Sequence, residues 1–219
     1  MQEGYDLYPR YTRPERLADA VVHALGLVFA LAACASLAVA LWPSHDVLLW
    51  LAVGLYGGGL LAMLGCSALY NLAGPGRWKS VFRRLDHAAI FVMIAGTYTP
   101  FLLVAVGGGW GLGLLAFVWT VALCGVAVKL FCPWRLDRLS VAAYLLLGWS
   151  IVVVLDPLFG AVSAAGLVLL GLGGLLYSLG VVFHLWHRLP YQNAIWHAFV
   201  LAAAACHFSA VLGEVAFAR

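Results

Sequence analysis

The stretch LADAVVHALGLVFALAACASLAVALW, residues 17–42, decides the fold class of this chain. After Asp19 and His23 it contains no charged residue and is almost continuously apolar. A helix that crosses a bilayer needs about 20 consecutive, mostly apolar residues, so this stretch predicts a transmembrane helix. It is also too long for the apolar core of a signal peptide, so we expect it to remain in the mature protein.

Six further segments have the same character, and Gly- and Pro-containing turn signals separate them. They span about 47–73, 86–106, 110–131, 139–158, 161–186 and 194–217. The chain is 65% hydrophobic and only 10% charged, with a mean hydropathy of +1.00. A soluble domain carries about 25% charged residues. We therefore predict an all-α integral membrane protein: a bundle of seven transmembrane helices in which residues 1–219 form a single membrane domain.

Lys and Arg are distributed unequally between the two sets of loops. Of the 12 such residues, Arg219 alone falls on one side, and eleven fall on the other: Arg10, Arg13, Arg16, Arg77, Lys79, Arg83, Arg84, Lys129, Arg135, Arg138 and Arg188. The positive-inside rule therefore predicts a cytoplasmic N-terminus and an external C-terminus. We expect a multi-pass protein of the cell's inner (plasma) membrane, with membrane lipids and no nucleic acid as partners. The sequence leaves the oligomeric state open.

Polar side chains within the apolar segments are costly in a bilayer, which makes them candidates for function. Four of the expected helices carry such residues near their cytoplasmic ends: Asp19 and His23, Ser67 and Asn71, Asp86 and His87, and Asn193 and His197. Three of these pairs have i, i+4 spacing, which puts both members on one helix face. The pattern predicts a polar cluster at one depth. It is either a hydrogen-bonded network that pins the helices together or a site that handles a metal ion or protons.

His207 lies apart from this cluster on the last segment, roughly 15 Å deeper than His197 by helical rise. We interpret it as a lone histidine whose hydrogen bonding is satisfied.

The motifs that contain these residues resemble the hemolysin III family, the bacterial branch of the progestin and adipoQ receptor superfamily. The similar stretches follow one another along nearly the whole chain: Glu15-Arg-Leu-Ala-Asp-Ala-Val-Val-His23, Ser67-Ala-Leu-Tyr-Asn71, Leu85-Asp86-His87 and Asn193-Ala-Ile-Trp-His197. The resemblance implies a seven-helix bundle with its N-terminus inside. It also implies a zinc site near the cytoplasmic face, built from Ser-x-x-x-His on helix two, an Asp on helix three and His-x-x-x-His on helix seven. Related ceramidases of the superfamily are thought to hydrolyse a lipid amide with a zinc-activated water.

This sequence departs from the implied ligand set at two of its three histidines. Asn71 and Asn193 occupy those positions, whereas Ser67, Asp86 and His197 match the pattern. Zinc favours imidazole, thiolate and carboxylate ligands, and a catalytic site usually supplies three of them. His197 and Asp86 alone would hold zinc weakly.

Other side chains could restore the ligand count. His23 is a substitute that would complete a two-histidine, one-carboxylate set with Asp86 and His197, and Asp19 and His87 are further donors.

Three hypotheses follow from the sequence. The first is a non-enzymatic or degenerate hemolysin III family membrane protein, with a degenerate cytoplasmic-side zinc site, that acts in membrane or lipid homeostasis. The alternative is a zinc-dependent hydrolase of a lipid amide, with Asp86 and Ser67 as catalytic residues. A further alternative is a channel or transporter. The metal content of the protein separates the first two.

Overall fold

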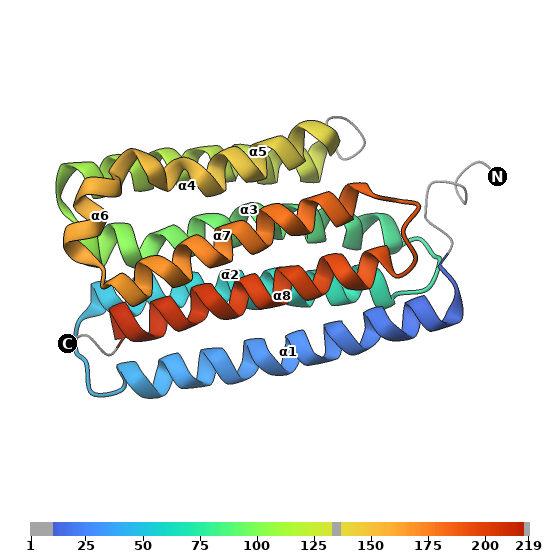
Figure 1. The fold of residues 1–219 in the computed structure, drawn as a ribbon, viewed down its shortest axis with the longest axis horizontal. Coiled ribbons are helices and arrows are strands. Elements are labelled where there is room, and N and C mark those ends of the chain that lie inside the picture. The colour runs from blue at the N-terminus through green and yellow to red at the C-terminus, as the bar shows by residue number, and fades with distance from the viewer. Residues whose placement is uncertain (1–10, 133–136, 217–219) are drawn as a thin grey trace.

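The fold is a bundle of helices that run back and forth along one long axis (Figure 1). A computed structural model describes residues 11–132 and 137–216. Its elements are α1 (Arg13–Leu41), α2 (Val47–Leu72), α3 (Lys79–Pro100), the π-helix η1 (Phe101–Val106), α4 (Gly108–Phe131), α5 (Asp137–Trp149), the 3-10 helix η2 (Ser150–Val154), α6 (Leu155–Ala161), α7 (Ala164–Leu185), α8 (Gln192–Val211) and the π-helix η3 (Leu212–Ala216). Together they make seven spans that are long and apolar enough to cross a membrane, which confirms the predicted fold class.

The centre of the bundle is held by close helix pairs. In Figure 1, α1 lies along one edge and α4 and α5 lie along the opposite edge, with α2, α3, α7 and α8 between them. At the α2–α3 contact, a Cβ atom added to Gly96 would lie 2.9 Å from the carbonyl oxygen of Leu55. A Cβ atom added to Gly59 would lie 3.2 Å from the Cα of Met93. The two backbones therefore touch directly, as small residues allow between membrane helices.

The third and fifth segments differ from the predicted boundaries. The third helix begins at Lys79 rather than at 86, because hydropathy marks only the apolar part of a helix that continues into a polar end. The fifth segment was expected to be one helix over 139–158. Instead, α5 ends at Trp149, and η2 and α6 complete the span. The sixth segment, predicted to begin at about 161, begins at Ala164, because Ala161 ends α6.

The break after α5 has a specific cause in α3. The hydroxyl of Tyr98 lies 2.9 Å from the carbonyl oxygen of Leu147 and accepts a hydrogen bond of 2.8 Å from the N–H of Ile151. In a continuous α-helix these two backbone groups would bond to each other. Insertion of a side chain into this ladder is a recognised cause of helix distortion. The hydroxyl of Tyr98 is therefore the hydrogen-bond partner of two backbone groups that no longer bond to each other.

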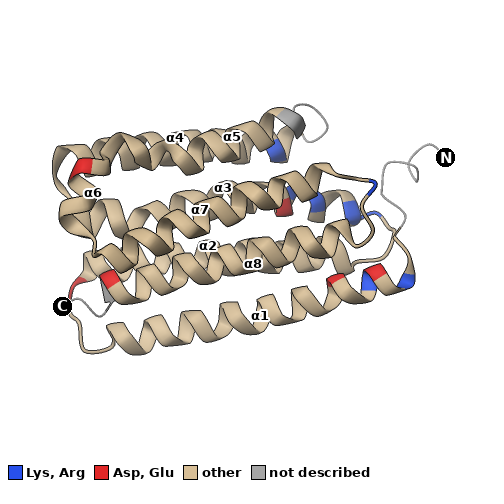
Figure 2. Ribbon diagram, in the orientation of Figure 1, with Lys and Arg blue, Asp and Glu red and all other residues tan. Residues whose placement is uncertain are grey.

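Charge divides the two ends of the bundle. Figure 2 shows Lys and Arg gathered at the end where α1 begins, while acidic residues alone mark the opposite end among the described residues. Arg13 and Lys79 open α1 and α3 at the basic end, and Lys129 lies in the last turn of α4. The unequal loop charges of the sequence therefore correspond to two physically separate ends.

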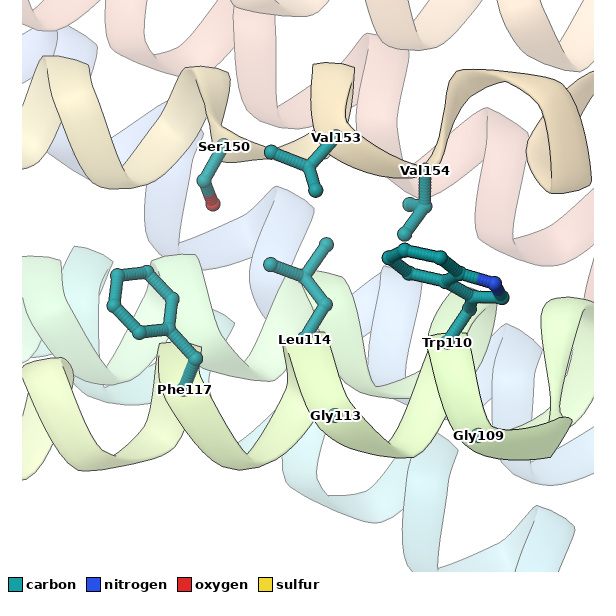
Figure 3. Close-up of a pocket in the computed structure, with 8 residues that line it drawn as sticks. All are labelled: Gly109, Trp110, Gly113, Leu114, Phe117, Ser150, Val153 and Val154. Carbon is teal, nitrogen blue, oxygen red and sulfur yellow. The ribbon is translucent and has the colours of Figure 1, made fainter.

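An apolar groove of about 470 Å³ lies between α4 and η2 (Figure 3). Trp110, Leu114 and Phe117 line one side of it, and Ser150, Val153 and Val154 line the other. None of these side chains is ionisable, and the hydroxyl of Ser150 is bonded to the carbonyl oxygen of Leu147 at 2.8 Å. The polar residues singled out by the sequence gather elsewhere, in the basic half of the bundle.

Candidate functional site

The ends of α1 and α8 are tied together, which sets the level of the residues that follow on both helices. Thr12 caps α1, and its hydroxyl oxygen accepts from the N–H of Glu15. One carboxylate oxygen of Glu15 in turn accepts a 3.0 Å hydrogen bond from the N–H of Tyr191, the N-cap residue of α8. Asp19 on α1 and His197 on α8 each follow within two turns of this link and therefore lie at about the same level.

Five side chains from α1, α2 and α8 form a closed ring of hydrogen bonds, called here the polar ring. The amide nitrogen of Asn193 donates to Asp19 Oδ2 at 3.0 Å and to Asn71 Oδ1 at 3.1 Å. The amide nitrogen of Asn71 donates to the backbone oxygen of Ser67 at 2.9 Å and to its Oγ at 3.3 Å. Ser67 Oγ lies 3.4 Å from His197 Nε2, and His197 Nδ1 lies 2.6 Å from Asp19 Oδ1.

The partners assign a direction to most bonds of the polar ring. An ionised carboxylate only accepts, so Nδ1 of His197 carries the proton and donates to Asp19. Nε2 of the neutral imidazole is then an acceptor, and the hydroxyl of Ser67 can donate its single proton to this nitrogen or to the carboxylate of Asp86 on α3. Each polar hydrogen of the four donor side chains consequently has an acceptor. The ring is also largely buried, with Asp19, Ser67 and His197 only 7%, 8% and 9% exposed.

His23 completes a candidate metal cluster beside the ring. Its Nε2 lies 3.4 Å from Asp19 Oδ2 but makes no hydrogen bond and is buried. The rings of His23 and His197 are 4.4 Å apart between centroids. One ligand atom from each of Asp19, His23 and His197 falls within 4.8 Å of the others. The carboxylate that the structure places in this cluster is Asp19, whereas the sequence favoured Asp86.

The two α3 residues take different positions. Asp86 interacts with the side chain of Ser67 and lies within electrostatic range of His23. It therefore faces the polar ring from outside. The backbone oxygen of His87 accepts a 2.8 Å hydrogen bond from the hydroxyl of Tyr144 on α5. Because this bond ties the α3 backbone to α5 at His87, that part of α3 packs against both the ring and α5.

The ligand positions implied by the family pattern do not fit zinc in this chain. The amide nitrogens of Asn71 and Asn193 are turned to partners within the ring, and Asn71 Oδ1 accepts from Asn193. The cluster of Asp19, His23 and His197 has the right donor types. It can take a metal through His197 Nδ1 only after that nitrogen loses the proton it shares with Asp19. The described residues therefore favour hydrogen bonding over coordination.

Tyr11 and Gln192 are additions that the sequence did not single out. The hydroxyl of Tyr11 donates to Gln192 Oε1 at 3.4 Å, and the amide of Gln192 donates to the carbonyl of His184 at 2.9 Å. Burial, reinforced by the nearby carboxylate of Asp19, raises the pKa of Tyr11 to about 12. A neutral tyrosine therefore lies within electrostatic range of Asp19. Tyr11 precedes the first apolar segment and Gln192 precedes the last, so the search for polar residues within those segments did not mark them.

His207 lies outside the site. Its Nε2 is 3.2 Å from the carbonyl oxygen of Leu170, and its ring packs against Tyr177 and fills the space beside Gly173. The carbonyl of Leu170, on the neighbouring helix α7, gives His207 a hydrogen-bond partner.

The fold and the site together define a class: a multi-pass, seven-helix membrane protein with a buried polar site near one end of the bundle. Residues 11–208 match the family described as Haemolysin-III related, and the chain belongs to that family. This confirms the resemblance drawn from the motifs and agrees with the expected location in the plasma membrane of bacteria.

Individual relatives extend from bacteria to mammals. The chain is 37% identical over 204 residues to a hemolysin-3 homolog of Bacillus subtilis, covering 92% of this chain and 95% of that protein. It is 37% identical over 198 residues to hemolysin-3 of Bacillus cereus, covering 90% of each. It is 30% identical over 166 residues to the human monocyte to macrophage differentiation factor, covering 72% of this chain and 67% of that protein. No solved structure matches the chain.

Proposed function

We propose that this chain acts on membrane lipids at the polar ring without a bound zinc ion, in membrane or lipid homeostasis. The closed ring is the observation that supports this function. A metal site presents free lone pairs to a common centre. In this ring, acceptor atoms already take hydrogen bonds from neighbouring side chains, namely those of Asp19, Asn71 and His197. The two asparagines thus act as donors that complete a network.

The position of the ring supports a lipid as its target. Asp19 follows Arg13 by six residues, about 9 Å along the helix axis, at the basic end of the bundle. We infer that this end faces the cytoplasm, because basic residues flank transmembrane helices on that side. At this depth the ring lies near the boundary between lipid headgroups and acyl chains.

A zinc-dependent hydrolase of a lipid amide is the second candidate. It is favoured by the grouping of Asp19, His23 and His197 within 4.8 Å and by the buried, unbonded Nε2 of His23. Bound zinc would supply an activated water. Those three residues would hold it, and Asp86 with Ser67 would lie beside it.

The metal content of the purified protein decides between the two candidates. We expect little zinc in the protein as it stands, and nearly one equivalent in the double variant Asn71→His, Asn193→His. The two substituted positions contact each other and adjoin His197 through Ser67, so the variant would present three imidazoles to one centre. Zinc is measured by mass spectrometry after dialysis against a weak chelator.

Near-stoichiometric zinc in the unmodified protein would instead support the hydrolase. In that case His23→Asn should remove the zinc, because His23 belongs to the alternative ligand set. His45→Asn is the matched control, since His45 is an exposed histidine in the loop between α1 and α2. Failure of both the unmodified protein and the double variant to bind zinc would contradict the geometry assigned to the asparagine positions.

A further inference from the structure

Three residues of the polar ring have the connectivity of a serine nucleophile with its general base. Ser67 Oγ lies 3.4 Å from His197 Nε2, and the other nitrogen of the same imidazole lies 2.6 Å from Asp19 Oδ1. Hydroxyl, imidazole and carboxylate follow one another in that order from three different helices. Activated nucleophiles are recognised by this arrangement, and the contact between hydroxyl and base is often looser when no substrate is bound.

We propose that Ser67 is a nucleophile activated by His197 and Asp19, and that the site transfers acyl groups from a membrane lipid ester or amide without a metal ion. This inference rests on the proposed function, since it assumes that the ring works in its hydrogen-bonded, zinc-free form. It adds a chemical step to a network that would otherwise only hold helices together.

The proton inventory of the ring fits this role. Asp19 accepts at Oδ1 from His197 and at Oδ2 from Asn193, so the carboxylate is held in place from both sides. Held in this way, it fixes the tautomer in which Nε2 of His197 faces the serine unprotonated. The same carboxylate stabilises the imidazolium that forms when Nε2 takes the proton of Ser67.

Asn71 positions the hydroxyl of Ser67. Its amide nitrogen donates to Ser67 Oγ at 3.3 Å and to the backbone oxygen of Ser67 at 2.9 Å. The first bond occupies one lone pair of Oγ and so orients the hydroxyl, whereas an oxyanion would form on the carbonyl oxygen of the substrate. Histidine at this position would carry only one hydrogen on each ring nitrogen and could not make both bonds that Asn71 makes to Ser67. Asn71 is therefore a positioning residue for Ser67.

The reaction balances with water as the only co-substrate. The oxygen of Ser67 forms a bond to the acyl carbon as its proton passes to Nε2 of His197. The bond from that carbon to the leaving oxygen or nitrogen breaks, and the imidazolium returns the proton to the leaving group. Water then adds to the acyl-serine with the same histidine as base, releasing a carboxylic acid and the free hydroxyl.

Asp86 is a competing acceptor for the same proton. Its carboxylate interacts with the side chain of Ser67 from α3. If Asp86 were the base, His197 would be dispensable. A test must therefore vary the two residues separately.

The experiment is covalent labelling of the full-length protein in lipid nanodiscs by an alkyl fluorophosphonate, with the modified residue mapped by mass spectrometry. We expect labelling at Ser67 that is unchanged by a strong chelator. General-base catalysis contributes on the order of 10²-fold or more, so His197→Gln and Asp19→Asn should slow labelling by that factor. Asp86→Asn removes the competing acceptor of the Ser67 proton, so this variant should label at least as fast as the unmodified protein.

Controls separate chemistry from folding. Ser36→Ala removes an exposed hydroxyl that is bonded to the carbonyl four residues earlier, and it should leave labelling unchanged. Thermal unfolding of each variant shows whether lost labelling reflects lost structure. Mapping on the unmodified protein needs no variant, so the proposal is tested even if His197→Gln does not fold.

The outcomes also distinguish this inference from the proposed function. No label on Ser67 of a zinc-free protein overturns the inference alone, as does labelling that requires added metal or that depends on Asp86 rather than His197. Stoichiometric zinc in the isolated protein overturns the proposed function. Labelling of Ser67 that persists after that zinc is removed would still support the nucleophile.

Discussion

Replacing Gly96 with alanine is expected to lower the free energy of unfolding by about 1–3 kcal/mol, the usual cost of overpacking a tight core. The new Cβ atom would lie 2.9 Å from the carbonyl oxygen of Leu55 and 3.4 Å from the Cα of Tyr56. Both are backbone atoms of α2 and cannot rotate away as a flexible side chain could. The two helices must therefore separate, and Gly96→Leu should prevent their packing altogether. Reversible unfolding in mixed detergent micelles measures the change.

Gly58→Ala is the matched control for this prediction. Gly58 is exposed on α2, and an added Cβ atom would meet nothing within 4 Å. Alanine favours a helix more than glycine does, so this variant should be neutral or slightly stabilised. If Gly96→Ala were as stable as Gly58→Ala, that result would contradict the close backbone contact described between α2 and α3.

Replacing Tyr98 with phenylalanine is expected to lower the free energy of unfolding by about 1–3 kcal/mol, the cost of leaving a buried polar group without its partner. The hydroxyl shares its single proton between the carbonyl oxygens of Leu147 and Gly148. Its oxygen accepts hydrogen bonds from the N–H of Ile151 and the hydroxyl of Ser150. No water at this depth can replace it, since Tyr98 is only 6% exposed within a transmembrane span.

Tyr191→Phe is the control for the tyrosine prediction, because Tyr191 is 43% exposed at the start of α8 and its backbone, rather than its ring, makes the bond to Glu15. Loss of the Tyr191 hydroxyl should change the free energy of unfolding little. Equal stability of Tyr98→Phe and the unmodified protein would mean that the α5 backbone closes its own hydrogen bonds and that the tyrosine does not cause the break.

The seven spans could be predicted because hydropathy is a local property of the chain. Residues 17–42, for example, read as a membrane helix without knowledge of any neighbour, and α1 covers Arg13–Leu41. The break in the fifth span could not be predicted in the same way. It depends on the hydroxyl of Tyr98, which precedes Ile151 by 53 residues. Nothing in the local sequence of 139–158 reports a hydroxyl that arrives from another helix.

The candidate site could also be predicted only in part, because the sequence gives the depth of a residue along its helix but not the rotation of that helix. Residue spacing and the order of the spans predicted that α1, α2 and α8 would bring polar side chains to one level. Which side chains meet depends on how each helix is turned about its axis. The 2.6 Å contact between His197 and Asp19 joins residues 178 positions apart, and only the packed bundle selects Asp19 over Asp86 as its partner.

The distorted fifth span also bears on the order in which the protein is assembled. Its α-helical parts, α5 and α6, have 13 and 7 residues, and neither alone reaches the roughly 20 residues that cross a bilayer. The backbone groups opened between them are satisfied by a side chain of the third span. Because that span is synthesised first, its tyrosine is already in the membrane when the fifth span arrives. The fifth span therefore completes its backbone hydrogen bonding against a helix that is synthesised before it.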